Sequence, residues 1–151
     1  MGIKSNRVLA SYFNFFGASG LDAVNAAAEV FSATGGDYVL TPGNGYKYHT
    51  FTSPGNFVTT GSSPNLQFVL VAGGGGGGGV DNSASGGGGG GGMVISSGFL
   101  CSAGTHPVTV GPGGTGQTGA SGTLGTGVDS VFAYTGSGSA TFTAKGGGGG
   151  D

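Results

Sequence analysis

The chain has 151 residues, of which 40 are glycine, and only 7% are charged, with a net charge of −2. Five prolines and no Gly-X-Y period exclude collagen, and the slightly positive mean hydropathy does not fit intrinsic disorder. Four basic residues cannot form a patch that follows a phosphate backbone, so we expect no nucleic-acid partner.

Residues 1–35 are poor in glycine and predict two short α-helices. Ser5 or Asn6 can cap the first helix, and Ser19 with Asp22 has the spacing of a capping box for the second, "LDAVNAAAEVF" at 21–31. We expect this segment to be an anchor that packs either on the rest of the chain or on another protein. No run reaches the ~18 apolar residues of a membrane span. The predicted assembly face of the first helix consists of Val8, Leu9, Tyr12, Phe13 and Phe16.

Residues 36–151 predict a glycine-rich β domain. Segments rich in Tyr, Val, Phe and Thr alternate with Pro-Gly and Asn-Gly turns, as at 41–45, and no helical period occurs after residue 35. The apolar segment "NLQFVLVA" at 65–72 predicts a strand that is buried on both faces. Because the chain stops within a glycine run at 146–150, we expect this domain to be truncated at its C-terminal end.

A weak internal repeat precedes two of the glycine runs. "FVTTGSSPNLQFVLVAGGGGG" at 57–77 parallels "FAYTGSGSATFTAKGGGGG" at 132–150. A linker has no physical reason to follow the same strand twice. The repeat therefore indicates that these glycines have a structural role.

Two unbroken runs of seven glycines occupy residues 73–79 and 86–92. A phosphate-binding loop requires a helix after the glycines, and "VDNSAS" followed by more glycines does not form one. Flexible linkers usually mix glycine with serine. We favour polyglycine II-type helices with three residues per turn, as in polyproline II, whose backbones bond laterally because no side chain intervenes. The expected lattice positions are Gly73, Gly76, Gly79, Gly86, Gly89, Gly92 and Gly148.

The remaining polar residues do not form a catalytic or metal-binding pattern. His49 and His106 are far apart in sequence and are expected on the surface. Cys101 is expected to be a small buried apolar residue, since no basic neighbour would lower its pKa. Asp81 and Asn82 are expected in a simple turn. We therefore expect no enzymatic activity, catalytic residue, metal or cofactor.

The order of motifs after residue 50 matches a known scheme. "FTSPGNF" is followed by an apolar strand into the first glycine run, a second run into "MVISSGF", then "VTVGPGG" and "DSVF" before the last run. This order resembles the glycine-rich domain of bacteriophage tail fibres and related virion proteins. It is also similar to the glycine-rich ectodomain of the anaplastic lymphoma kinase receptor, for which polyglycine helices are implied. The cysteines of that receptor are missing here, which favours the phage family.

The resemblance implies a non-enzymatic structural protein of the phage virion, most simply a tail fibre or another particle appendage. The N-terminal anchor would dock on other virion proteins. Fibres commonly close around a three-fold axis, so we expect a homotrimer or another homo-oligomer, with Phe13 and Phe16 at or near the contact. The alternative is an adhesin module that binds a glycan of the host surface through its loops.

Overall fold

The computed structural model describes residues 31–61, 63–79, 86–117 and 124–150. Within these ranges every regular element is a β-strand, which confirms the all-β class for this part of the chain. The predicted N-terminal helices fall almost entirely on residues 1–30, outside the described residues. The strands are β1 (Ser32–Thr34), β2 (Tyr38–Leu40), β3 (Tyr48–Thr50), β4 (Gly55–Thr60), β5 (Ser63–Val71), β6 (Met93–Cys101), β7 (Gly104–Thr109), β8 (Ser130–Tyr134) and β9 (Ala140–Ala144).

Five strands form one antiparallel sheet in the order β1-β4-β7-β8-β9. Phe57 on β4 pairs with His106 on β7, and Phe132 on β8 pairs with Phe142 on β9. Side chains alternate between the two faces of a strand, so these paired residues share one face. That face is buried, as the alternation of buried and exposed residues along β4, β7 and β8 shows.

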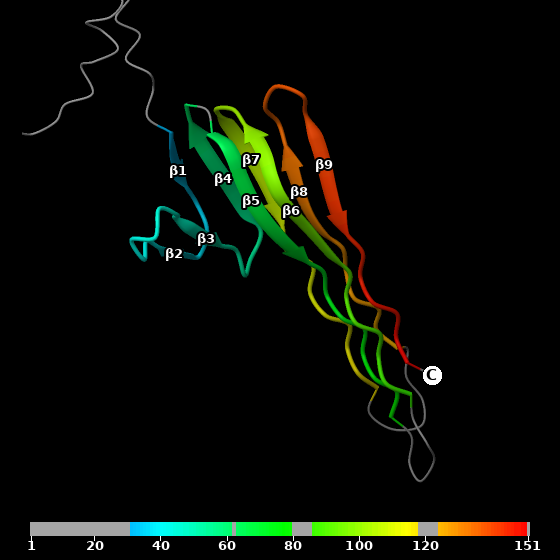
Figure 1. Ribbon diagram of the computed structural model, residues 1–151. Helices are drawn as coiled ribbons and strands as arrows, with labels where there is room; N and C mark the ends of the chain where they lie inside the picture. The colour runs from blue at the N-terminus through cyan, green and yellow to red at the C-terminus, as the bar shows by residue number, and fades with distance from the viewer. Residues whose placement is uncertain (1–30, 62, 80–85, 118–123, 151) are drawn as a thin grey trace, which may run out of the picture.

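Strands β5 and β6 pair with each other and form a second layer in front of the larger sheet (Figure 1). Between the layers lies an aromatic cluster, in which the ring of Phe68 is 4.9 Å from that of Phe142 and the ring of Phe99 is 4.6 Å from that of Tyr134. Edge-to-face ring pairs at such distances contribute about 0.5–1.5 kcal/mol beyond the burial of their area. This cluster fixes the second layer over β8 and β9.

The outer face of β5 and β6 is open, which contradicts the prediction that residues 65–72 are buried on both faces. Leu70 is 8% exposed, whereas its neighbours Val69 and Val71 are 62% and 56% exposed. The physical reason is that the described part of the chain supplies only two layers, and a strand in an outer layer buries one face. A continuous apolar run does not distinguish this arrangement from a central strand.

The β region begins before residue 36. Ser32 on β1 pairs with Thr60 on β4, and Ala33 is 6% exposed. Phe31, expected in the second helix, lies outside any helix and packs against the core. Residues 31–35 therefore belong structurally to the β region, although the sequence places them in the N-terminal anchor.

A short hairpin of β2 and β3 lies beside β1 (Figure 1). The predicted turn at 41–45 connects its strands, and Gly43 and Gly45 there have φ angles of +84° and +87°, which favour glycine. Asp37 holds the base of the hairpin: its carboxylate accepts hydrogen bonds from the N–H groups of Thr52 (2.7 Å) and Ser53 (2.9 Å) and from both hydroxyls. These bonds, led by that from the Thr52 N–H, lower the pKa of Asp37 to about 2.

Candidate functional site: the glycine bundle

Five glycine-rich segments leave the same end of the two sheets and lie side by side (Figure 1). We name them segments I to V in chain order. Segment I (73–79) follows β5, segment II (86–92) precedes β6, segment III (111–117) follows β7, segment IV (124–128) precedes β8 and segment V (146–150) follows β9. Because the sheets place these strand ends together, segments far apart in sequence become neighbours. We call the five segments together the bundle.

Hydrogen bonds recur at every third residue between segment II and segment I, including Ala72 directly before segment I. The donor–acceptor pairs are in antiparallel order, with N···O distances of 2.8–3.0 Å: Ala72 to Gly92, Gly75 to Gly89 and Gly78 to Gly86. In a β-ladder the pattern repeats every two residues instead. The bundle is therefore not a continuation of the sheets.

Segment I is the centre of the bundle, because it bonds to all four other segments. The remaining bonds of segment I keep the same step of three residues: Gly73 to Val128, Gly76 to Gly125, Gly114 to Gly74, Gln117 to Gly77, Gly147 to Gly73 and Gly150 to Gly76. Every residue from Ala72 to Gly78 thus makes at least one backbone hydrogen bond. The other segments, with Lys145 directly before segment V, also bond to one another: Gly89 to Gly148, Gly92 to Lys145, Gly125 to Thr115, Val128 to Pro112 and Gly127 to Gly147.

The bundle requires glycine because of space and not because of backbone conformation. The glycines with φ between +20° and +160° all lie elsewhere in the described residues. A Cβ atom on Gly73 would overlap the carbonyl oxygen of Pro112, and one on Gly75 would overlap that of Gly148. Real Cβ atoms do not approach oxygen so closely, so neighbouring backbones would have to separate.

The predicted lattice positions lie in this bundle, but they differ in how much space surrounds them. A Cβ on Gly76 would overlap the carbonyl oxygen of Thr115, whereas one on Gly89 would stand 3.2 Å from the nitrogen of Gly148. Gly148 accepts a hydrogen bond from Gly89, yet its own Cβ direction is open. Of the others, Gly73, Gly86 and Gly92 take part in bundle hydrogen bonds, and Gly79 is the last described residue of segment I.

Sequence reasoning missed segments III and IV, where glycine is mixed with other residues. Cβ atoms on Gly111 and Gly114 would overlap the carbonyl oxygens of Val128 and Gly125. These two glycines are three residues apart, which matches the three-residue step of the hydrogen bonds in the bundle. A glycine at every third position is therefore the signal that could have identified segment III. Proline is compatible with position 112 because its carbonyl accepts a hydrogen bond from Val128, and its nitrogen carries no hydrogen that would need an acceptor.

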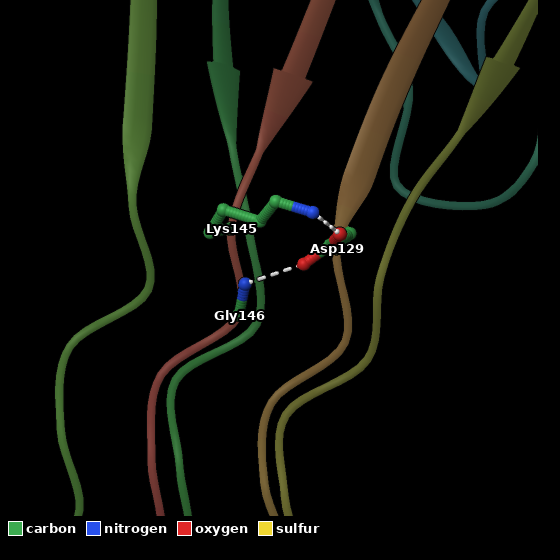
Figure 2. Close-up of polar contacts among 3 residues, drawn as sticks. All are labelled: Asp129, Lys145 and Gly146. Carbon is green, nitrogen blue, oxygen red and sulfur yellow. Dashed lines mark hydrogen bonds and ion pairs between the residues drawn. The ribbon is translucent and has the colours of Figure 1, made fainter.

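An ion pair marks the point where segments IV and V meet the sheet (Figure 2). The ammonium of Lys145 lies 2.6 Å from one carboxylate oxygen of Asp129, and the N–H of Gly146 donates to the other oxygen over 2.9 Å. The bond from Lys145, followed by that from Gly146, lowers the pKa of Asp129. Asp129 therefore fixes the start of segment V relative to the end of segment IV.

The buried polar side chains of the larger sheet include His106, which the sequence analysis predicted to lie on the surface. His106 is fully buried, not on the surface, because the inward face of β7 carries it. The N–H of Thr135 donates to its Nδ1 (3.2 Å), so Nε2 carries the proton and donates to the hydroxyl of Thr59 (3.0 Å). That hydroxyl donates in turn to the carbonyl of Ser102 (2.9 Å). Burial lowers the pKa of His106, which favours the neutral imidazole.

Cys101 is fully buried beside this histidine, which confirms the sequence prediction. Its sulfur is 3.7 Å from Nε2 of His106, and burial raises the pKa of the thiol. A thiol held in its neutral form is a poor nucleophile. The pair therefore has the properties of a packed structural contact.

The other histidine, His49, is partly buried. Its Nδ1–H donates to the carbonyl of Gly35 over 2.7 Å, and its ring packs against the edge of Phe57 at 5.3 Å. Asp81 and Asn82 lie outside the described residues. Among those that are described, no group of three or more His, Cys, Asp or Glu side chains could hold a metal ion. The described residues also form no helix that is long and apolar enough to cross a membrane.

The family model described as "Glycine-rich domain" matches residues 51–151 of the chain. No curated protein and no solved structure matches the chain. The matched range covers about two thirds of the chain and includes strands β4 to β9 and all five segments of the bundle. The chain therefore belongs to the glycine-rich domain family.

Proposed function

We propose that this protein is a non-enzymatic structural component of a bacteriophage virion, most simply a tail fibre or another particle appendage. The observation that carries the proposal is the bundle, in which backbones bond at every third residue and the inward positions leave no space for Cβ atoms. Such an element provides stiffness and length without charge or catalytic groups. The resemblance of residues 51–150 to glycine-rich domains of phage tail fibres supports the virion location.

The segments of the bundle are polyglycine II-type helices in this proposal. A three-residue hydrogen-bond step, with no described glycine of the bundle in the left-handed φ region, fits a left-handed helix with three residues per turn and a rise of ~3.1 Å. At that rise, a seven-residue run extends about 22 Å. The bundle would then form a stalk or tip that projects from the end of the β layers.

The rigidity of the bundle depends on its connectivity. Ordering one residue costs about 1–2 kcal/mol of backbone entropy, and glycine loses the most. A single backbone hydrogen bond contributes only about 0.5–1.5 kcal/mol net. Two segments bonded at every third residue would therefore not remain ordered alone. Segment I bonds to four neighbours, and each segment continues into a strand or leaves one, so the bundle and the β layers should form together.

The buried Cys101 and His106 support the absence of a catalytic role. Both side chains are fully buried. Burial raises the pKa of Cys101 and lowers the pKa of His106, and both shifts favour the neutral side chain. The N-terminal segment, with its predicted face of Val8, Leu9, Tyr12, Phe13 and Phe16, would dock this structure on other virion proteins.

An adhesin that binds a host glycan is the second candidate, and the β2–β3 hairpin favours it. Tyr38, Tyr46 and Tyr48 are 68%, 48% and 47% exposed. Asn44 contacts two of them: its Nδ2 donates to the hydroxyl of Tyr48, and its Oδ1 accepts from the N–H of Tyr46. Tyrosine combines an apolar ring with a polar tip, which suits the mixed surface of a sugar.

Purified particles test the virion assignment. Particles of a phage whose genome encodes an epitope-tagged chain are purified by density gradient and imaged with a bound antibody fragment. We expect the tag on intact particles at a fixed symmetric position. Absence of the chain from intact particles overturns the assignment. If the isolated protein also binds host envelopes and Tyr38→Ala/Tyr48→Ala abolishes that binding, the adhesin role is supported.

A further inference from the structure

One side of segment II has no neighbour among the described residues. Gly87 and Gly90 are exposed, and a Cβ atom on either would meet nothing within 4 Å. Among the described residues, no partner accepts from their N–H groups or donates to the carbonyl of Gly90. The carbonyl of Gly87 lies toward segment V, where a Cβ atom on Gly150 would overlap it. In contrast, Cβ atoms on Gly88 and Gly91 would overlap the carbonyl oxygens of Gly75 and Ala72 on the segment I side.

The contacts of the described residues within one chain therefore do not explain glycine at positions 87 and 90. Neither residue has a φ angle in the left-handed region, so alanine would fit both the backbone and the available space. Alanine at such a position also reduces the entropy that folding must overcome. The run nevertheless consists of glycine throughout residues 86–92. A neighbouring backbone that packs against Gly87 and Gly90 would leave no space for Cβ atoms there. Segment I imposes the same requirement on the opposite side of segment II.

The open side of segment II continues into an apolar surface on the second layer. Met93 follows Gly90 by three residues and is 60% exposed. It pairs across β5 and β6 with Val71, and Val69 pairs with Ile95 in the same way. These four side chains, each 56–62% exposed, form an outward apolar patch. The sequence from 82 to 128 contains no Asp, Glu, Lys or Arg.

We propose that this surface, formed by Gly87, Gly90 and the apolar patch of Val69, Val71, Met93 and Ile95, is a contact with a second copy of this chain. In that contact, segment II of one copy lies against segment II of the other. The N–H groups of Gly87 and Gly90 have no acceptor among the described residues, and they need a partner backbone with the same three-residue step and no side chains on the contact side. This chain supplies such a partner in segment II itself, so the surface is complementary to its own copy. In a two-fold symmetric contact, the same surface of both copies takes part.

The contact does not depend on the virion assignment, because it concerns only copies of the isolated chain. The test is sedimentation velocity of the full chain and of a Gly87→Ala/Gly90→Ala variant over micromolar concentrations. We expect the parent to self-associate and the variant to have a dissociation constant at least tenfold higher, which corresponds to about 1.4 kcal/mol. Its thermal unfolding should occur at the parent temperature or above, because the added methyl groups have space within one chain.

Matched variants separate the contact from general effects on folding. Gly148→Ala adds a methyl group at an open position of segment V and should leave self-association unchanged. Ile95→Asp places a charge in the apolar patch and should weaken self-association. A monomeric parent, or a Gly87→Ala/Gly90→Ala variant that associates like the parent, overturns the proposal. So does loss of association in Phe13→Asp/Phe16→Asp alone, since the copies would then meet through residues 1–30.

Discussion

The backbone N–H of Gly75 donates a hydrogen bond to the carbonyl of Gly89 over 2.8 Å, which joins one seven-glycine run to the other. The two runs are separated in sequence by a polar loop, yet they form antiparallel neighbours in one bundle. Neither run is therefore a flexible linker in this structure. The following predictions depend on this arrangement and on the buried groups that support it.

Side chains at the centre of the bundle should prevent folding, whereas those at its open side should not. A Cβ on Gly76 overlaps the carbonyl of Thr115, so Gly76→Ala should destabilise by at least the ~1–3 kcal/mol typical of overpacking, and Gly76→Val should leave no soluble folded protein. Gly89→Ala should have a smaller effect, because its Cβ is tight at 3.2 Å but does not overlap. Gly148→Ala is the matched control. Thermal unfolding checks the order, and equal melting of the Gly76 variant and the control would contradict it.

Stability should fall as pH decreases below the ordinary pKa of histidine. Burial lowers the pKa of His106 in the folded state below 6.5, so the unfolded chain binds the proton more readily. The contribution of His106 is therefore fully present above pH 6.5 and is lost as pH falls toward the folded pKa. The free energy of unfolding, measured by urea titration between neutral and mildly acidic pH, checks this. His106→Gln should be less stable at neutral pH but lack this decrease, and an identical decrease in both proteins would assign it to other groups.

Loss of the Asp129 carboxylate should loosen the junction of segments IV and V. Lys145 and the N–H of Gly146 both bond to this carboxylate and lower its pKa. Its contribution is present above the unfolded pKa of aspartate and is lost as pH falls through the lower folded value. Asp129→Ala should increase amide exchange at Gly146 and Gly147 at neutral pH. Lys145→Ala, which keeps the bond to Gly146, should increase it less, and equal effects would show that the ion pair dominates.

Removal of the N-terminal anchor should separate docking from folding. Deleting residues 1–30 leaves Phe31 and β1 in place, so the β signature in circular dichroism should persist while incorporation into particles is lost. Deleting residues 1–34 also removes β1, which pairs with β4, and should lower the melting temperature. Normal occupancy of the 1–30 deletion on particles would refute the docking role.

The sequence predicted the strands well because Val, Phe, Tyr and Thr alternate between clear turn signals, as at Gly43 and Gly45. It also predicted that the glycine runs pack, because pure glycine between apolar strands does not resemble a linker. It did not predict segments III and IV. In segment III, Pro112 and Thr115 stand between the glycines and obscure their three-residue spacing. Nor did it predict that His106 is buried, since whether a strand face is buried depends on which sheet covers it. The anchor residues Val8 to Phe16 stay a prediction, because they lie outside the described residues.

Amide hydrogen exchange of individual glycines, followed by NMR on glycine-labelled protein, tests the bundle most directly. The N–H groups of Gly75, Gly76 and Gly147 donate bundle hydrogen bonds and should exchange far more slowly than unstructured glycine. Gly43 and Gly45, in the exposed turn of the β2–β3 hairpin, should exchange rapidly and serve as the internal reference. Exchange of Gly75, Gly76 and Gly147 at the rate of Gly43 and Gly45 would show that the glycine segments are not bonded to one another, and would contradict the bundle.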